Sequence, residues 1–246
     1  MFSLSIVLPA YNEEANVENA INEVSMVSQE MGIDHEIILV NDGSADRTGE
    51  IARELAQRIP NLRVVEHFPN RGYGGALKAG FAAASKDLIG FFPADKQFDF
   101  GEVGRLLKRI NEADIVCGYR ADRRDNLLRK VNAFGWKMVV RLLFGYLCRD
   151  VDCGFKLFRR TVLSRVNIVS DGAMVDTELL AGARARGFDI AEEPLTHLPR
   201  VAGEATGADL AVIVRAFRDL FQFWWRLSQE LREEKQAYRE RLAVRF

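Results

Sequence analysis

Two apolar runs of the sequence end in acidic side chains. Asp42 follows residues 36–40, and Asp95, with Gln97 two positions further on, follows residues 88–92. A carboxylate at a strand end can accept hydrogen bonds from a nucleobase N–H or from ribose hydroxyls. A carboxylate with an amide oxygen suits a hard divalent cation that bridges two phosphates. Either aspartate alone is more typical of a turn, but their shared position at strand ends indicates a nucleotide site.

A basic segment lies further along the chain. Residues 120–160 contain eleven Lys and Arg against four Asp, a local net charge of +7, whereas the whole chain carries −1. This balanced total lacks the basic excess of nucleic-acid-binding domains, so we expect no nucleic-acid partner. Charge runs usually form solvated surfaces. Beside an apolar helix, this one favours a surface for phosphate groups and a membrane.

Short apolar runs alternate with amphipathic runs and must position these side chains. We expect strands at residues 4–9, 36–40, 63–67, 88–92 and 114–119, and helices at residues 13–31, 48–58, 76–85 and 102–111. This alternation is typical of β-α-β units on a mostly parallel α/β sheet, here of about five strands. Ligands of such open sheets bind beyond the carboxyl ends of the strands, where Asp42 and Asp95 fall.

Two further amphipathic helices are expected, at residues 127–147 and 210–231. The second has an apolar stripe with Trp224 and Trp225 beside arginines, which is typical of a helix at a lipid interface. An ordinary packing helix or a homo-oligomer contact has the same pattern. We hypothesise that both helices form a platform on a membrane surface. The expected organisation is an α/β domain at residues 1–207 and a helical extension at residues 208–246.

The compartment is inferred from what the sequence lacks. No stretch reaches the roughly 18 apolar residues of a membrane span, and the N-terminal run lacks the basic start of a signal peptide. Cys117, Cys148 and Cys153 have neither the number nor the spacing of a disulfide framework or a four-ligand zinc site. We therefore expect a cytoplasmic protein, peripheral on the inner face of the membrane.

Six strings, taken in order, resemble the family 2 glycosyltransferases, which have the GT-A fold. They are VLPAYNEE (7–14), VNDGSADRT (40–48), NRGYGGA (70–76), DIVCGYR (114–120), RDVDCGFKLF (149–158) and PRVAGE (199–204). The last three are similar to the branch of dolichyl- and polyprenyl-phosphate sugar synthases, and the similarity runs from about Ser5 to Gly207. The resemblance implies an inverting transferase that moves a sugar from a UDP- or GDP-sugar to a polyprenyl or dolichyl phosphate at the cytoplasmic membrane face.

The resemblance also implies roles for individual residues. The implied donor-nucleotide residues are Pro9, Tyr11, Glu13, Asp42, Ala94 and Asp95. A divalent metal, Mg²⁺ or Mn²⁺, is implied at Asp95 and Gln97. The family's D-x-D-x-Q motif differs here in one position, because Pro93 replaces its first aspartate and has no side-chain acceptor.

The resemblance also implies residues for the acceptor phosphate, several of them in the basic segment. Arg120, Arg129 and Arg200 match phosphate-binding positions, and Arg123, Arg124 and Lys130 add to the local field. The implied catalytic residues are Asp95, Asp150 and Arg120. A phosphate acceptor is already an anionic nucleophile, so the reaction needs a cationic cradle more than a strong base.

Other functions remain open. Transfer to a soluble or hydroxyl acceptor needs a base, for which Asp150 or Asp152 would serve. A scaffold that only binds nucleotide sugars is kept open by Pro93. A processive polysaccharide synthase is disfavoured, because its Q-x-x-R-W motif is absent from the sequence.

Four polar residues have no clear place in this site. His67 and His197 lack the spacing of a metal or nucleophile pair, and we interpret them as structural. Asp176 and Glu178 fall at the start of an expected helix, where carboxylates stabilise the helix dipole, so a structural role and a site role are equally compatible with them.

Overall fold

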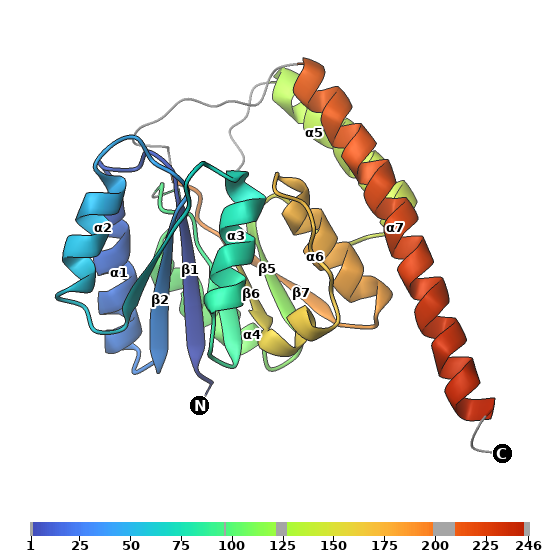
Figure 1. Ribbon diagram of the computed structural model, residues 1–246, viewed down its shortest axis with the longest axis horizontal. Helices are drawn as coiled ribbons and strands as arrows, with labels where there is room; N and C mark the ends of the chain where they lie inside the picture. Colours follow the sequence, from blue (N-terminus) through green and yellow to red (C-terminus); the bar gives the residue numbers. More distant parts are fainter. Residues whose placement is uncertain (1, 96, 122–126, 199–209, 244–246) are drawn as a thin grey trace. The chain divides into compact units, whose positions relative to one another are not determined.

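The computed structural model describes residues 2–95, 97–121, 127–198 and 210–243, and a mixed sheet forms its centre. The strands are β1 (Leu4–Ala10), β2 (His35–Asn41), β3 (Leu62–Glu66), β4 (Leu88–Phe91), β5 (Ile115–Arg120), β6 (Lys156–Arg159) and β7 (Ile190–Leu195). Their order is β3-β2-β1-β4-β6-β5-β7 (Figure 1). Strand β6 is antiparallel to β4 and β5, and the other neighbours pair in parallel, so the predicted mostly parallel α/β sheet is confirmed.

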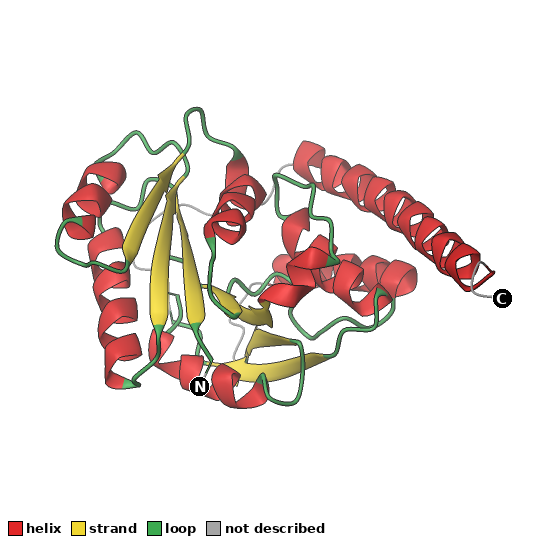
Figure 2. Cartoon of the chain, turned by 60° about the horizontal axis from the view of Figure 1, so that its bottom comes forward, coloured by secondary structure: helices red, strands yellow, loops and turns green. Residues whose placement is uncertain are grey.

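Helices cover both faces of the sheet (Figure 2). They are α1 (Val17–Glu30), α2 (Thr48–Ala56), α3 (Gly72–Ala83), α4 (Val103–Arg109) and α6 (Met174–Ala185), with 3-10 turns η1 (Phe100–Glu102) and η2 (Arg160–Ser164). Alternate residues of β1 pack on opposite faces of the sheet. Ile6 belongs to one apolar cluster with Ile21 of α1, while Val7 lies against Gly80 of α3. This period of two is what a strand buried on both sides requires.

The sheet has more strands than the sequence predicted. We expected about five, and β6 and β7 were missed. The four residues of β6 include a lysine and an arginine, and β7 contains Glu192, Glu193 and Pro194, so neither shows a continuous apolar run. Helix α1 also starts four residues later than expected. The main-chain N–H groups of Glu13 and Glu14 instead donate to the side chains of Thr48, which begins α2, and of Asp46, which lies just before it.

The chain divides into two units. One consists of residues 1–124 and 148–204 and contains the sheet; the other consists of residues 125–147 and 205–246 and contains α5 (Leu127–Phe144) and α7 (Leu210–Ala243). Within the second unit, the ring centroids of Trp136 and Phe217 are 5.4 Å apart, and those of Phe144 and Phe223 are 5.2 Å apart. The two helices therefore run parallel to each other. Within the described residues, no helix is long and apolar enough to span a bilayer.

Candidate active site at the carboxyl edge of the sheet

The carboxyl ends of β1, β2 and β4 come together at one edge of the sheet. Pro9 pairs with Val40 in parallel register, and Phe92 N donates to Val7 O at 3.0 Å. Consequently the residues that follow these strands share one edge. Those from the expected donor site are Tyr11, Asp42, Ala94 and Asp95. The sequence-based placement at strand ends is thus observed in the structure, in the position where α/β sheets bind ligands.

The loop after β1 is held against the loop after β2. The main-chain N–H of Asn12 donates to Ser44 Oγ at 3.0 Å, and that of Glu13 donates to Thr48 Oγ1 at 2.8 Å. Asn12 adopts a left-handed backbone with φ 55°, a conformation that asparagine tolerates better than most residues. These contacts fix the backbone on either side of Asn12, at Tyr11, which is 52% exposed, and at Glu13.

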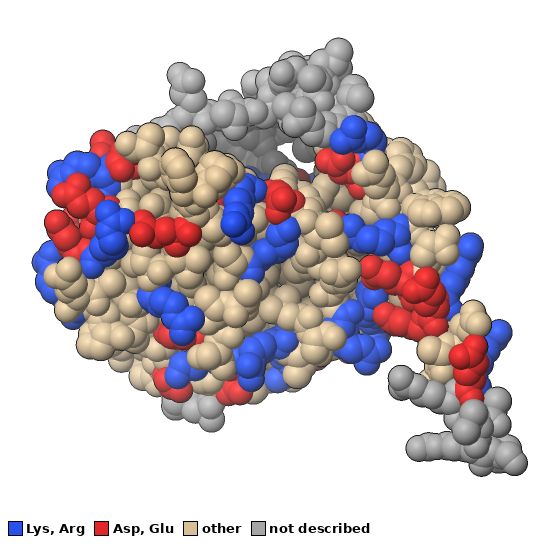
Figure 3. Space-filling view, in the orientation of Figure 1, with Lys and Arg blue, Asp and Glu red and all other residues tan. Residues whose placement is uncertain are grey.

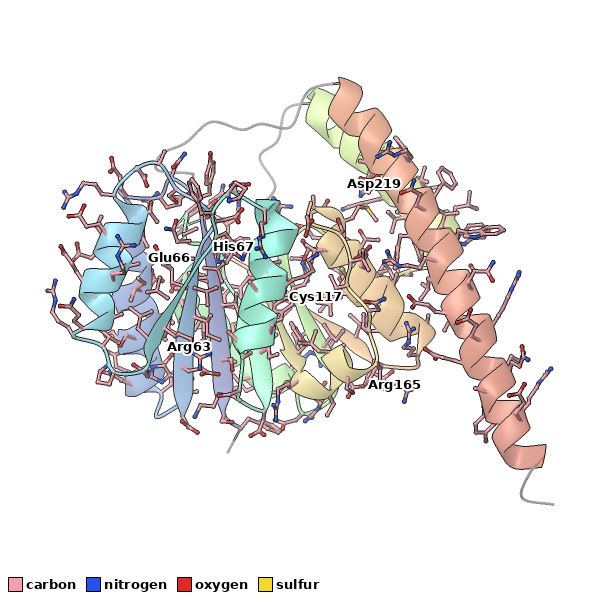
Figure 4. All side chains as sticks on the ribbon, viewed as in Figure 1. Arg63, Glu66, His67, Cys117, Arg165 and Asp219 are labelled. Atoms are coloured by element: carbon pink, nitrogen blue, oxygen red, sulfur yellow. The ribbon has the colours of Figure 1, made fainter. Side chains whose placement is uncertain are left out.

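Asp42 is buried and tied to three neighbouring segments. Its main-chain N–H donates to Ala10 O at 2.9 Å, and its main-chain O accepts from Asn70 Nδ2 at 2.8 Å. Its Oδ1 atom accepts from His67 Nδ1 at 2.7 Å and from Arg71 N at 2.9 Å. His67, interpreted from sequence as structural, therefore contacts an expected donor-site residue. In Figure 4 it lies at the carboxyl end of the strands, beside the start of α3.

The glycine-rich segment at the start of α3 packs against the loop at residues 169–172. The main-chain N–H groups of Gly74 and Gly75 donate to Asp171 O at 2.9 and 3.3 Å. A Cβ atom at Gly74 would lie only 2.5 Å from Ser170 O, which is why a glycine is needed there. Glu178 secures the same loop, because its Oε2 accepts from Val169 N at 2.7 Å and from Ser170 N at 2.9 Å. Glu178 thus has a structural role.

Asp95 and Gln97 lie in one turn after β4. Asp95 is 8% exposed, and its Oδ1 accepts from Gln97 N at 3.2 Å. Gln97 Nε2 lies 3.4 Å from Nε2 of His197, which the sequence analysis interprets as structural. The ring of Pro93 lies next to Gly154, with 3.5 Å between its Cγ and a Cβ built there. Within the described residues, no three His, Cys, Asp or Glu side chains are grouped to hold a metal.

Arg120 and Asp150 form a bidentate ion pair. Arg120 Nε lies 2.7 Å from Oδ2 of Asp150, and its Nη2 lies 2.9 Å from Oδ1. Burial alone lowers the pKa of Arg120, but the hydrogen bonds and the charge of Asp150 outweigh it and raise that pKa. Arg120 is therefore a fixed cation.

A buried lysine was missed by the sequence analysis. Lys156 is 0% exposed, and its Nζ donates to Asp176 Oδ1 at 2.6 Å and to the main-chain O of Cys153. Burial raises the pKa of Asp176 to about 6 against the opposing effect of Lys156. Burial also raises the pKa of the Cys153 thiol to about 12. A lysine flanked by Phe155 and Leu157 is the one sequence signal that pointed to this pair.

Most of the other basic residues expected at the site lie outside the described residues. They are Arg200, Arg123 and Arg124, together with the side chains of Arg129 and Lys130 on α5. On the face shown in Figure 3, basic and acidic side chains interleave. Among the ion pairs of the described residues are those of Arg47 with Glu50 and of Arg53 with Glu66.

Comparison with known proteins gives matches over most of the chain. Residues 5–166 match the model of the family described as glycosyl transferase family 2. Glycosyltransferase AglD of Haloferax volcanii is 32% identical over 92% of this chain and 37% of its own length. The undecaprenyl-phosphate 4-deoxy-4-formamido-L-arabinose transferase of Edwardsiella ictaluri is 32% identical over 82% of this chain and 62% of its own. The dolichyl-phosphate beta-glucosyltransferase ALG5A of Trichomonas vaginalis is 34% identical over 78% of this chain and 64% of its own length. The chain thus spans between about a third and two thirds of these relatives.

Solved structures show the same arrangement of elements. The glucosyl-3-phosphoglycerate synthase of Mycobacterium tuberculosis with UDP superposes with a TM-score of 0.69 at 22% identity, over 92% of this chain and 80% of that one. The same enzyme with Mn²⁺, UDP and glucosyl-3-phosphoglycerate gives a TM-score of 0.64 at 24% identity, over 82% and 73%. At this identity the similarity shows a shared fold.

Proposed function

The chain belongs to glycosyl transferase family 2, and on that premise we propose that it moves a sugar, with inversion, from a nucleotide-diphosphate sugar to a polyprenyl phosphate. The predicted family and the predicted GT-A fold are both confirmed. The observation that carries the proposal is the shared placement of Asp42 and Asp95 beyond the carboxyl ends of parallel strands. Two relatives named for undecaprenyl-phosphate and dolichyl-phosphate transfer support the lipid acceptor.

The donor nucleotide lies over β1 and β2 in this proposal. Asp42 accepts a hydrogen bond from the base or the ribose, while Pro9, Tyr11, Glu13 and Ala94 line the pocket. The fixed backbone of the loop after β1 supports this assignment, because a pocket with preset walls loses less entropy when it binds.

Asp95 and Gln97 are the proposed metal residues. Their turn brings a carboxylate and a carboxamide together, and oxygen donors of this kind fit Mg²⁺ or Mn²⁺. Two protein ligands suffice, because Mg²⁺ usually keeps waters and binds through one or two carboxylates plus substrate phosphates. When bound, the ion supplies charge neutralisation for the leaving diphosphate. The solved structures of the synthase with Mn²⁺ or Mg²⁺ and UDP are consistent with such a site.

The acceptor phosphate is assigned to the arginines. Arg120, oriented by Asp150, is the proposed contact for the phosphate, and Arg129 and Arg200 are the further phosphate-binding residues that the family resemblance implies. No strong base is required, because a phosphate monoester is already an anion near neutral pH. Both oxygens of the Asp150 carboxylate accept hydrogen bonds from Arg120, so this carboxylate is engaged with the arginine rather than placed as the base that a hydroxyl acceptor would need.

The second unit supports a membrane surface as the place of reaction. Exposed apolar side chains occur on both of its helices, with Met138 51% and Leu142 84% exposed on α5, and Phe221 51% and Trp225 62% exposed on α7. Basic residues such as Arg218 accompany them, which fits an interfacial helix on anionic lipid. We place the protein on the cytoplasmic face, where it would be peripheral.

One assay tests the function. The full chain is incubated with UDP- and GDP-sugars, Mg²⁺ or Mn²⁺ and a short polyprenyl phosphate, and the release of nucleoside diphosphate is measured. Release that requires the lipid and is lost in Asp95→Ala supports the proposal. Release with a soluble acceptor in place of the lipid supports the alternative acceptor, and nucleotide binding without release supports a scaffold.

Pro93 gives a second test of the same site. Pro93→Asp restores the D-x-D-x-Q motif in the sequence, and adds an acceptor group beside Asp95. A large gain in donor affinity would show that the native site is weakened at this position. An unchanged affinity would show that Asp95 and Gln97 are sufficient.

A further inference from the structure

We propose that His67 is a positioning residue for the donor nucleoside, because it fixes which oxygen of Asp42 faces that nucleoside. This inference rests on the proposed function, in which Asp42 accepts a hydrogen bond from the base or the ribose. His67 follows β3 and Asp42 follows β2, and the main-chain N–H of His67 donates to Asn41 O at 3.0 Å. The two side chains are therefore brought together by neighbouring strands of the sheet.

The contact between the two side chains is short and shielded from water. His67 Nδ1 lies 2.7 Å from Asp42 Oδ1, and the two side chains are 6% and 5% exposed. An ionised carboxylate can only accept hydrogen bonds, so Nδ1 carries the proton in this contact. A buried hydrogen bond to a charged acceptor is stronger than one between neutral groups.

The hydrogen bonds to the Asp42 carboxylate are unevenly distributed. Within the described residues, the bonds from His67 Nδ1 and from Arg71 N at 2.9 Å both end on Oδ1. The protein thus holds one oxygen with two donors, and Oδ2 is the acceptor presented to the nucleoside. Arg71 contributes through its main chain and stays in place in any side-chain variant. Of the two hydrogen bonds to Oδ1, only the one from His67 can therefore be removed by a side-chain substitution.

The hydrogen bond, and not the imidazole ring as such, is the feature that matters. His67→Leu replaces the imidazole with an apolar side chain of similar size and so removes the donor. His67→Asn places an amide N–H near the position of Nδ1 and restores the donor. If Asp42 is positioned by this bond, asparagine should rescue what leucine loses. A residue that only fills space would show the reverse order.

The test measures ligand binding by titration calorimetry with the full chain. The probes are UDP and GDP, to identify the nucleotide bound by the wild type, and inorganic pyrophosphate with Mn²⁺, which lacks the nucleoside. We expect His67→Leu to weaken binding of the nucleotide by about tenfold or more, and His67→Asn to stay within about threefold of wild type. Pyrophosphate affinity should be unchanged in both, because the phosphate site lies at Asp95.

His35→Leu is the matched control. His35 begins β2, the strand that leads to Asp42, but lies at its opposite end, with Nδ1 2.8 Å from Ile33 O. We expect this variant to bind the nucleotide as the wild type does. Thermal unfolding of all variants shows whether each is folded, and His67→Asn keeps the comparison informative if His67→Leu is not.

The outcomes separate the inference from the function on which it rests. Full nucleotide affinity in His67→Leu, or equal loss of nucleotide and pyrophosphate, overturns the positioning role while the transferase function stands. So does a loss in His67→Asn as large as that in His67→Leu. If the wild type binds neither UDP nor GDP, the proposed function is overturned, and the inference with it.

Discussion

Arg120 on β5 and Asp150, in the segment after α5, form a bidentate ion pair, in which Nε and Nη2 of the arginine lie 2.7 and 2.9 Å from the two carboxylate oxygens. The side chains are 18% and 7% exposed, so water competes weakly for either group. A planar guanidinium held on two atoms has its plane and direction set. Asp150 thereby determines where the remaining N–H donors of Arg120 point.

The first prediction concerns this pair. Asp150→Asn keeps the shape of the side chain but cannot accept both hydrogen bonds, so Arg120 loses its fixed direction. We expect lipid-dependent release of nucleoside diphosphate to fall by about tenfold or more. Arg120→Lys should lose activity too, since an ammonium group cannot replace the bidentate contact of the guanidinium. The control is Asp114→Asn, because Asp114 pairs with Arg159 at 3.7 Å with both side chains about a third exposed. Equal loss in the control would refute the specific role.

The sequence predicted those parts of the site that depend on one strand each. Asp42 and Asp95 could be located because parallel strands place their carboxyl ends at one edge, whatever the details of packing. Pairs that depend on two distant segments could not be located. His67 lies 25 residues from Asp42, and Lys156 lies 20 residues from Asp176, and only the folded sheet brings the members of each pair together.

The charged residues of β6 explain why the sequence did not predict this strand. Lysine is almost never fully buried unless it is paired, so a short segment that contains Lys156 and Arg159 is not read as an interior strand. Here Asp176 supplies the partner from α6. Gly72 and Gly74 are a comparable case. The sequence predicts a loop at these residues, but a Cβ at either position would lie within 2.6 Å of a main-chain oxygen of residues 170–172, which are far away in the sequence.

The second prediction concerns the metal. Asp95→Asn and Gln97→Leu each remove an oxygen donor of the proposed site, and we expect both to raise the Mn²⁺ concentration needed for half-maximal donor binding by about tenfold. Chelation of the metal from the wild type should weaken donor binding in the same way. Asp99→Asn is the control, because Asp99 accepts from Gly101 N at 2.7 Å at the start of η1. Metal dependence that is the same in all variants would place the ion elsewhere.

The third prediction concerns the buried lysine. Asp176→Asn leaves the ammonium group of Lys156 without its counter-charge, and breaking a buried pair in this way costs about 3–5 kcal/mol in free energy of unfolding. Replacing both residues, as Lys156→Met with Asp176→Leu, should recover most of that loss because no charge stays buried. Urea unfolding measures both variants. A double variant less stable than Asp176→Asn would show that the pair contributes more than charge balance.

The fourth prediction concerns the second unit. Leu142→Ser combined with Trp225→Ser removes exposed apolar surface from α5 and α7, and we expect binding to anionic vesicles in a flotation assay to fall strongly. Binding of the wild type should also weaken as salt rises, because basic side chains contribute to it. Tyr238→Ser is the matched control, because Tyr238 is 65% exposed but lies further along α7. Deletion of residues 210–246 without any change in flotation would reject the membrane platform.

The fifth prediction is a pH dependence at the amino end of the sheet. Glu36 Oε1 accepts from Ser5 Oγ at 2.6 Å and from Ser85 N at 2.6 Å. Burial alone raises the pKa of Glu36, but these hydrogen bonds outweigh it and hold the pKa below its ordinary value of 4.5.

A carboxylate whose pKa is lower in the folded state stabilises the fold above its ordinary pKa, and this contribution is lost as the pH falls through the folded value. The difference in free energy of unfolding between wild type and Glu36→Gln should therefore be largest near neutral pH and shrink in acid. Glu54→Gln changes an exposed residue of α2 and should follow the wild type at every pH. A Glu36→Gln difference that stays constant from pH 7 into acid would mean that the serine contacts favour the amide as much as the carboxylate.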